Sequence, residues 1–361
     1  MADRPRILVV ATKGAGSNDE QRILELLADH DVIRFPFDRS RKLANTPGLL
    51  RAARRERPAL IVMEGTGIAG GVALLLARLF LGIPFVVSSG DSVGPFLAAA
   101  HPVLALPGWI YEWLLCRASA GFIGWTPYLV GRALTLGARR GVTAAGFALQ
   151  PEPQRGREEV RERLGMPQDA LVFGIAGSLA FNARKGYCYG LELVRAVRRV
   201  ARQDVAVLVV GDGDGLERLR ELAGPDLGRR VFLPGAVPQA EVAAYLGAID
   251  VASLPQSLDQ VGAVRYTTKI SEYVSARLPL VTGRLPVAYD LADTWSWRLP
   301  GDAPWSEEYV AALAALMERV THDEIAGRRA AMPRTLSVFD RAEQRRRVAA
   351  FVDELLADRP G

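Results

Sequence analysis

The chain is poor in several residue types that would define a function at once. Its 361 residues include only two cysteines and three histidines. The two cysteines, Cys116 and Cys188, cannot build a disulfide framework, and no C-x-x-C spacing suggests a metal site. We therefore expect two inert, half-buried thiols in a reducing compartment.

Long apolar runs and a strong net charge are also missing. The two most apolar stretches, 68–88 and 95–116, are interrupted by prolines and charged residues, so neither offers the roughly 20 clean apolar residues of a membrane-spanning helix. No cleavable signal pattern precedes the first strand-like run. The 45 Lys and Arg residues exceed the 40 Asp and Glu by five, which suits phosphate-bearing ligands but is too weak to indicate nucleic-acid binding. We expect a soluble, cytoplasmic protein that binds no nucleic acid.

What the chain does have is a regular alternation of short β-rich runs and helical patterns. This alternation predicts an α/β fold with parallel sheets, and the continuous apolar runs predict strands covered by helices on both faces. The predicted strands are 7–11, 32–35, 60–64, 85–88, 122–125, 171–176, 205–210, 231–233, 251–254 and 280–282. The clearest helical patterns are 19–28, 71–81, 189–202, 216–223, 239–246 and 268–276.

A proline- and glycine-containing polar break at 150–156 has the composition of a linker. We therefore predict two doubly wound, Rossmann-like domains, 1–150 and 151–335. The remaining segment, 336–361, contains an amphipathic helix at 339–356 that Asp340 could cap; it either finishes the second domain or crosses back to the first. Ligands of such sheets bind at the carboxyl ends of the strands, so we expect the site in a central cleft between the domains.

Two glycine-rich turns follow predicted strands. Gly14 and Gly16 could present backbone N–H groups to an anion, but their spacing matches no phosphate-binding fingerprint, and a tight turn without a ligand is equally compatible. In Val-Gly-Asp-Gly-Asp-Gly (210–215), Asp212 and Asp214 could hold a metal, or the glycines could cradle a phosphate. The further oxygen ligands of a metal loop are missing, so we favour a tight turn that lines the cleft and binds no metal.

A cationic pair, Arg184 and Lys185, lies in the loop after strand 171–176. A loop at the carboxyl end of a strand is well placed for these side chains to bind a diphosphate. The alternative is a solvated surface pair without a ligand.

The segment 255–283 carries the densest set of polar residues. Thr267 or Thr268 can cap a helix whose free N–H groups suit an anion. One turn further along, Glu272 could accept two hydrogen bonds from a ribose diol. Lys269 and Glu272 could equally form an i,i+3 surface pair.

Four stretches of the second half, taken together, resemble the nucleotide-sugar-binding domain of GT-B-fold glycosyltransferases, in particular the retaining, family-4-like enzymes of group 1. They are FGIAGSLAFNARKG (173–186), VLVVGDGDGLERLREL (207–222), VFLPGAVPQAEVAAYLGAIDV (231–251) and KISEYVSARLPLVTG (269–283). The family shows the same order of strand, Lys-Gly loop, Val-Gly-Asp-Gly turn, base-contacting loop and Glu-Tyr helix. The first half resembles it more loosely, through its glycine loop and the strand 122–125.

The resemblance implies roles for individual residues. Lys185 would bind the donor diphosphate, Glu272 would hold the nucleotide ribose, and the loop with Val231 and Leu233 would border the base. The helix that opens at 267–269 would face the phosphates, with no metal ion or other cofactor. The final helix would cross back onto the first domain.

Three positions depart from the family pattern. Ser178 stands where the family commonly has an arginine, and Arg184 or Arg265 could supply that charge. Val264 occupies the place of the first of two glutamates, of which Glu272 is the second. Gly90 and Asp91 stand where the first domain usually has a His-Asp pair, so Asp91 is the candidate catalytic carboxylate there, with a helix cap as the alternative.

By this resemblance we expect a glycosyltransferase that moves a sugar from a nucleotide-diphospho-sugar to a hydroxyl, with retention at the anomeric carbon. The acceptor could be a saccharide, a lipid-linked saccharide or a small molecule. Lys185, a second cation and the helix N-terminus would stabilise the departing diphosphate. Two alternatives stay open: a nucleotide-sugar-binding protein without turnover, and a nucleotide-sugar 2-epimerase of the same fold.

The segment 107–115 (PGWIYEWLL) is rich in aromatic residues. We expect it to be a buried helix of the first domain. The alternative is peripheral contact with the inner face of a membrane that holds a lipid-linked acceptor. Polybasic flanks, which would strengthen the membrane alternative, are absent.

Overall fold

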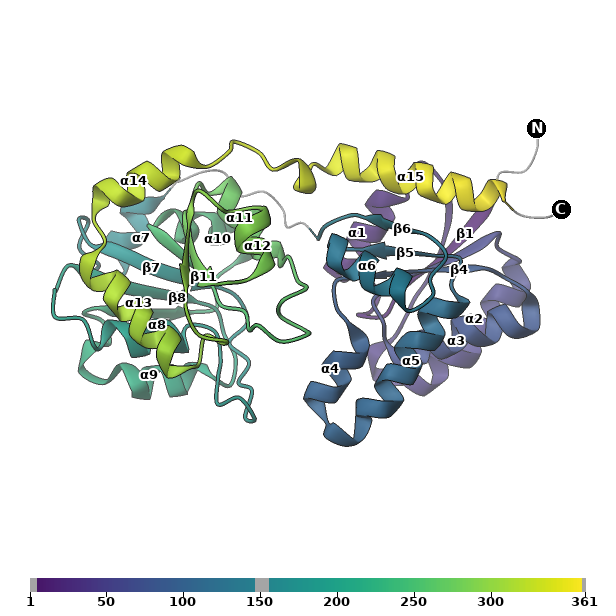
Figure 1. The fold of residues 1–361 in the computed structure, drawn as a ribbon, viewed down its shortest axis with the longest axis horizontal. Helices are drawn as coiled ribbons and strands as arrows, with labels where there is room; N and C mark the ends of the chain where they lie inside the picture. The colour runs from purple at the N-terminus through teal and green to yellow at the C-terminus, as the bar shows by residue number, and fades with distance from the viewer. Residues whose placement is uncertain (1–4, 147–155, 359–361) are drawn as a thin grey trace. The chain divides into compact units, whose positions relative to one another are not determined.

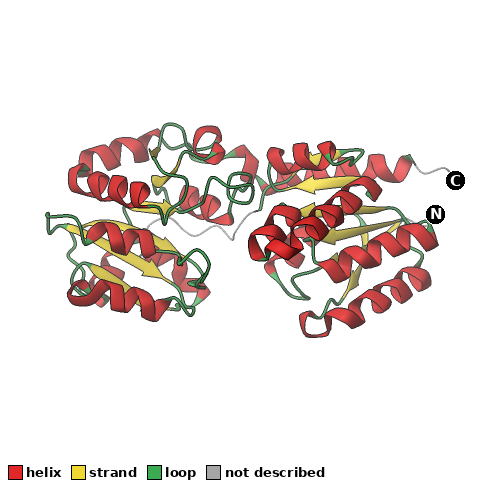
Figure 2. Ribbon diagram, turned by 60° about the horizontal axis from the view of Figure 1, so that its bottom comes forward, coloured by secondary structure: helices red, strands yellow, loops and turns green. Residues whose placement is uncertain are grey.

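The computed structural model describes residues 5–146 and 156–358, which form two compact units (Figure 1). Unit 1 contains residues 5–146, Val264–Tyr266 and 337–358, and unit 2 contains residues 156–263 and Thr267–Leu336. The linker predicted at 150–156 lies outside the described residues except for Gly156. In both units the strands form one parallel sheet between helices (Figure 2), as the continuous apolar runs predict.

The sheet of unit 1 has the strand order β2-β1-β3-β4-β5-β6. Alternate strand residues serve opposite faces. Leu8 and Ile61 pack with the helices α2, α3, α5 and α6, while Ile7 and Val9 pack with α1 and α15. The elements are β1 (Arg6–Ala11), α1 (Asn18–Leu26), β2 (Asp31–Phe35), α2 (Lys42–Glu56), β3 (Leu60–Glu64), α3 (Ile68–Leu81), β4 (Phe85–Ser89), α4 (Val93–Ala100), α5 (Ala105–Ala118), β5 (Gly121–Gly124), α6 (Pro127–Thr135), β6 (Gly141–Thr143) and α15 (Arg341–Ala357).

The sheet of unit 2 has the order β12-β11-β10-β7-β8-β9. One hydrophobic cluster of this unit joins β7 and β8 to α8, α9 and α13. The elements are α7 (Arg157–Arg163), β7 (Leu171–Ala176), α8 (Leu191–Val197), β8 (Val205–Val210), α9 (Leu216–Ala223), β9 (Val231–Gly235), α10 (Val242–Gly247), β10 (Val251–Leu254), α11 (Thr268–Ser275), β11 (Leu280–Gly283), α12 (Pro286–Asp290), β12 (Ser296–Leu299), α13 (Glu307–Arg319) and α14 (His322–Ala331).

The strand predictions agree with the structure to within two residues at each end, and the helix predictions agree less well. Of the predicted helix 189–202, only Leu191–Val197 (α8) is helical. The helix begins at Leu191 because the chain turns at Gly190 in a left-handed conformation (φ 88°). Sequence analysis did not predict α2, which contains Pro47 followed by Gly48, two residues that normally mark a break. The short strands β6 and β12 at the sheet edges were also missed.

The last described helix, α15, begins where Asp340 accepts a hydrogen bond from the Glu343 amide (2.9 Å), as predicted for its cap. Its buried residues Val348, Phe351 and Val352 pack in the cluster around β1. A hydrogen bond between His30 Nε2 and Asp353 Oδ1 (3.1 Å) also joins it to unit 1.

Both cysteines are buried and free. Burial raises the pKa of Cys116 to about 12 and that of Cys188 to about 11, so both thiols are protonated at neutral pH and are poor nucleophiles. Both thiols are thus buried more fully than the predicted half-burial, and their raised pKa values agree with the expectation that they are inert.

A carboxyl group lies fully buried in unit 2. Glu192 receives hydrogen bonds from the hydroxyls of Tyr187 (2.8 Å) and Ser253 (2.9 Å), and no cation pairs with it among the described residues. Burial raises its pKa to about 7, although the two hydroxyls and backbone amides favour the charged form. Glu192 therefore connects the loop after β7 to β10 and titrates near neutrality.

We expect Glu192→Gln to remove a pH dependence of stability. Because the folded pKa lies above the ordinary value, this group stabilises the fold fully below about pH 4.5 and loses that contribution as pH rises through 7, by about 3 kcal/mol. Urea unfolding of unit 2 from pH 5 to pH 8 measures the loss. Glutamine resembles the protonated acid, so the variant should vary less with pH; an unchanged slope would contradict the assignment.

Candidate functional site

The carboxyl edge of the unit 2 sheet is formed by two glycine loops in direct contact. The Leu179 amide donates to the Asp212 carbonyl and the Gly215 amide to the Leu179 carbonyl, both at 2.9 Å. A Cβ added to Gly211 would lie 1.8 Å from the Gly177 carbonyl oxygen. Only glycine at 211 therefore lets the loop after β8 lie against the loop after β7.

The two aspartates of the glycine run hold backbone amides. Asp214 accepts from the Phe181 amide (2.7 Å), and Asp212 accepts from the Gly213 amide (2.8 Å). The run is a tight turn into α9, and these contacts give its carboxylates a structural role.

Lys185 extends from a tight loop in which Asn182 and Tyr187 pair across a β-bridge. Its ammonium group lies 3.2 Å from Asp259 Oδ2 and 4.6 Å from the centre of the Trp305 ring. Burial raises the pKa of Asp259, but the Gly262 amide, together with Ser257, the Val261 amide and Lys185, brings it below its usual value. The predicted diphosphate cation thus faces a fixed, ionised carboxylate.

Lys269, in the first turn of α11, reaches back to the loop after β7. A Cβ on Gly177 would lie 2.4 Å from Lys269 Nζ, and the same ammonium group lies 5.1 Å from the Tyr189 ring centre. Among the described residues no carboxylate forms an ion pair with it. Burial lowers its pKa, against the opposing charge of Glu272. A half-buried cation without an anion is costly unless a ligand completes it.

Glu272 lies one turn after Lys269 on α11 and is half-buried. Its side chain has no hydrogen-bond or ion-pair partner in the described part of the chain, so the surface pair considered for Lys269 and Glu272 does not form. Burial raises its pKa, and Lys269 lowers it. Thr267 is the N-cap residue, but its hydroxyl makes no capping bond and is buried without a partner; Thr268 is the first helical residue.

The remaining unit 2 residues of the predicted site differ in exposure. Ser178 and Arg184 are exposed in the loop after β7. Leu233 is half-buried, and Val231 is fully buried in the core. Only the backbone of Val231, and not its side chain, is therefore placed to border a ligand.

At the carboxyl edge of unit 1, the loop after β1 makes its own contacts. Gly14 and Gly16 have positive φ (103° and 79°), as a tight turn requires. The Gly16 amide donates to the buried carboxylate of Glu20 (2.7 Å), and Ser17 caps α1 by accepting from the Glu20 amide. One of the amides predicted to face an anion is thus already occupied.

Asp91 forms an ion pair with Arg265, a residue of the short segment Val264–Tyr266 that belongs to unit 1. The Val264 side chain packs on the unit 1 core, and its carbonyl accepts from the Thr126 hydroxyl (2.8 Å). Arg265 is therefore placed with Asp91 in unit 1.

Sequence analysis missed a buried charged cluster beneath this edge. Arg22 donates to Glu64 Oε2 (2.9 Å) and lies 4.7 Å from the Trp125 ring centre, while the Trp125 indole donates to Glu64 Oε1 (3.2 Å). The cluster joins α1 to β3 and to the end of β5. A glutamate that ends an apolar strand (LIVME) was the available signal.

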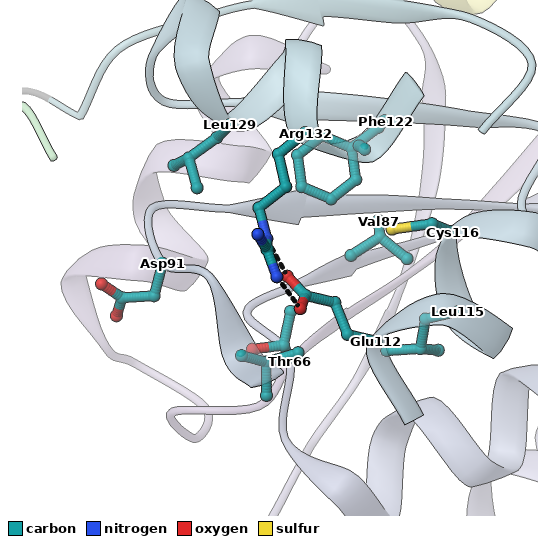
Figure 3. A pocket seen from close by; sticks show the side chains of 11 residues that line it. Thr66, Val87, Asp91, Glu112, Leu115, Cys116, Phe122, Leu129 and Arg132 are labelled. Carbon is teal, nitrogen blue, oxygen red and sulfur yellow. Dashed lines mark hydrogen bonds and ion pairs between the residues drawn. The ribbon is translucent and has the colours of Figure 1, made fainter. Parts of the chain in front are cut away.

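A small cavity lies behind Asp91, between β4 and the helices α4, α5 and α6 (Figure 3). Its volume of about 10 Å³ is room for about one water, too little for a sugar. Arg132 binds Glu112 with two hydrogen bonds (2.8 and 2.6 Å), and Glu112 also accepts from the Gly94 amide (3.2 Å). The Arg132–Glu112 pair in the cavity wall therefore connects α6, α5 and the start of α4, which is a structural role.

Comparison with known families supports the predicted resemblance. Residues 170–320 match the family described as glycosyl transferases group 1. This match confirms the resemblance to the group 1 glycosyltransferases, and the solved structures below share the GT-B fold. No curated protein sequence matches the chain.

Solved structures share the fold over the whole chain. HepE from Anabaena, determined in complex with UDP and glucose, superposes with a TM-score of 0.70 at 16% identity, covering 97% of this chain and all of that one. Sucrose-phosphate synthase from Thermosynechococcus elongatus gives 0.63 at 16% identity (98% and 97% covered). A Listeria monocytogenes protein described as a UDP-N-acetylglucosamine 2-epimerase gives 0.63 at 11% identity (99% and 98% covered). The chain therefore has the GT-B fold, with two Rossmann-like domains.

We expect Gly211→Ala to disrupt the carboxyl edge of unit 2. A methyl group at 211 would meet the Gly177 carbonyl and force the two loops apart, at a cost of about 3 kcal/mol or more. Gly131, inside α6 with no atom near its missing Cβ, is the matched control, because alanine there should be neutral or stabilising. Thermal unfolding of both variants measures the difference; equal melting temperatures would contradict the contact.

Proposed function

We propose, on the grounds that residues 170–320 match the group 1 glycosyltransferases and that the chain has the GT-B fold, that this protein is a retaining, metal-independent glycosyltransferase. Its donor is a nucleotide-diphospho-sugar and its acceptor carries a hydroxyl group. UDP is the first nucleotide to test, because HepE, a protein of the same fold, was determined with UDP.

The observation that carries the proposal is the cation at the carboxyl end of β7. Lys269 Nζ lies against Gly177 and forms no ion pair with a carboxylate among the described residues; the charge of Glu272, one turn along α11, acts on it only at longer range. A diphosphate is an anion that would offset its burial. Lys185, on the loop that follows the same strand, supplies a second cation, which would exchange its ion pair with Asp259 for the ligand.

Lys269 also accounts for the departure at Ser178. The family pattern places an arginine at this position, directly after Gly177. Because Lys269 reaches Gly177 from α11, it would supply the charge from a different element. Neither Arg184, which is exposed, nor Arg265, which is paired with Asp91, is needed for that role.

Glu272 fits the ribose role that the resemblance implies. It is half-buried and has no bonding partner among the described residues, so its carboxylate can accept hydrogen bonds from a diol. Burial raises its pKa, and donors from a bound ribose would favour the ionised form. The unpartnered Thr267 hydroxyl at the start of α11 is a further polar group available to the donor.

In the proposed reaction the acceptor oxygen forms a bond to the anomeric carbon while the bond to the diphosphate oxygen breaks. Lys185, Lys269 and the N-terminus of α11 stabilise the charge that develops on the diphosphate. The acceptor proton passes to the departing phosphate oxygen on the same face, which retains the configuration. Asp91 is the alternative base, but its carboxylate is already paired with Arg265.

A 2-epimerase remains the second candidate because a protein described as one shares the fold at a TM-score of 0.63. It would interconvert free nucleotide-sugars without an acceptor. A binding protein without turnover would show ligand-induced stabilisation alone. Product analysis with and without an acceptor separates the three functions.

We expect UDP to stabilise the chain and Lys269→Met to weaken its binding. At 100 times Kd, binding adds about 2.7 kcal/mol to the free energy of unfolding, a shift of several degrees. Loss of one charge-assisted contact should weaken binding roughly 10- to 100-fold, and Lys185→Met and Glu272→Ala should act in the same direction. Thermal unfolding with UDP, GDP and ADP measures this.

Arg198→Met, which removes an exposed cation elsewhere in unit 2, is the control and should bind as the native chain does. Ser178→Arg in the Lys269→Met background should restore part of the affinity, because it returns a cation to the same loop. Lack of stabilisation by every nucleotide and nucleotide-sugar would contradict the donor site.

We expect sugar transfer to persist in excess EDTA and to give a product with the anomeric configuration of the donor. In this proposal Lys185 and Lys269, and not a metal ion, stabilise the negative charge of the diphosphate. Lys185→Met should therefore lower kcat by about 10²–10³-fold. Proton NMR of the product reports the configuration. An inverted product, or activity that disappears with EDTA and returns with a divalent ion, would contradict this mechanism.

A further inference from the structure

Exposed apolar side chains are concentrated on one part of unit 1. They lie on α3, on α4, on the short turn Pro102–Leu104 and on α5, which follow one another around the lower part of unit 1 in Figure 1. We call them the apolar platform: Ile68, Val72, Leu79, Phe80, Leu81, Phe96, Val103, Leu104, Leu106, Ile110, Trp113 and Leu114. Val103 is 87% exposed and Leu106 is 70% exposed. The helix 107–115, expected to be buried, is thus buried on one face only.

The platform is held rigidly by close contacts on its inner side. Gly94 of α4 and Gly108 of α5 approach each other so closely that a Cβ on either would lie within 3.4 Å of the other's carbonyl oxygen. The Tyr111 hydroxyl donates to the Thr66 and Gly67 carbonyls, and a Cβ on Gly71 would lie 2.0 Å from it. Because the inner contacts are fixed in this way, the outer apolar side chains cannot fold inward.

Charge is distributed unequally around the platform. Residues 93–111 contain no Asp, Glu, Lys or Arg, whereas residues 39–57 contain seven Lys and Arg and one Glu. The latter segment includes α2, which packs beside α3. Arg51, Arg54 and Arg55 lie on one exposed face of α2. The basic residues that are missing next to 107–115 in the sequence are therefore found on α2, which packs beside α3 of the platform.

We propose that the apolar platform and the arginines of α2 bind unit 1 to the surface of an anionic lipid bilayer. Apolar and aromatic side chains enter the boundary between headgroups and acyl chains, and nearby arginines attract anionic headgroups. The platform helices lie on the bilayer, since α3 and α5 have 14 residues each and α4 has eight, fewer than the roughly 20 of a membrane span. None of the described helices is long and apolar enough to cross a membrane.

The charge of α2 favours a bilayer over a second copy of the chain. A symmetric dimer through the platform would bring the same surface of each copy together. The arginines of α2 would then meet either the partner's arginines or its uncharged residues 93–111, and neither offers an opposite charge. An anionic bilayer offers the opposite charge and needs no complementary shape.

The position of the platform bears on the acceptor. Ile68 opens α3 directly after the loop that follows β3, and α4 begins two residues after Asp91. The platform thus starts at the carboxyl edge of unit 1. If the proposed transfer is correct, on which this step rests, an acceptor anchored in the bilayer would be presented beside that edge.

The test is co-sedimentation of the full chain with vesicles of phosphatidylcholine alone and with 30% phosphatidylglycerol. We expect binding to the anionic vesicles and weakening by about tenfold or more for Val103→Glu and for Leu106→Glu. Leu227→Glu places the same charge on an exposed apolar position of unit 2 (42% exposed) and should bind unchanged. Because Val103, Leu106 and Leu227 are exposed, we expect these substitutions to leave the fold intact, and thermal unfolding of each variant checks this.

A second pair of variants tests the charge. Arg54→Gln should weaken binding to the anionic vesicles about fivefold, with no effect for Arg198→Gln, and added salt should reduce the difference. No sedimentation with either vesicle, or equal binding by Val103→Glu and the native chain, would overturn the proposal. A native dimer that Val103→Glu converts to a monomer, without vesicle binding, would identify a second copy as the occupant and also overturn it. Stabilisation by UDP in all these variants reports the donor site separately.

Discussion

The contact between the Gly177 carbonyl and Gly211 determines the arrangement of the carboxyl edge of the unit 2 sheet. The loops after β7 and β8 share backbone hydrogen bonds there, and the β7 loop carries Lys185 in its continuation. Lys269 then rests on the Cα of Gly177. Because Gly211 and Gly177 have no side chains, the two loops can touch and the Lys269 ammonium group can reach the end of β7. A larger residue at 177 would displace that ammonium group.

The buried and half-buried charges of the chain fall into two groups. Arg22 with Glu64, and Arg161 with Asp250 (2.8 Å), are satisfied by protein partners, so their roles are structural. Lys269 and Glu272 have no such partners within the described chain. Because unpaired charge is costly inside a protein, the second group indicates where a ligand would complete the structure.

Local patterns predicted much of the fold and only part of the site. Parallel strands covered on both faces are continuous apolar runs, so β7, β8 and β10 could be located from the sequence alone. The helix α2 could not, because Pro47 and Gly48 interrupt its pattern. Asp91 and Arg265 are 174 positions apart, and no local spacing reveals that they pair. The motif resemblance predicts Lys185, Lys269 and Glu272 as site residues, but only the fold shows that Lys269 lies beside Gly177 and that the Val231 side chain faces the core.

The path of the chain has a consequence for how the protein can form. Unit 1 begins with β1, yet the face of its sheet that carries Ile7 and Val9 is covered by α1 together with α15, and α15 is made after the whole of unit 2. The segment Val264–Tyr266, also part of unit 1, is synthesised within unit 2. During translation, one face of the unit 1 sheet therefore stays incompletely covered until α15 has been synthesised. Unit 2 begins later in the chain than unit 1, but all of its residues are synthesised before α15, so its core can be completed first.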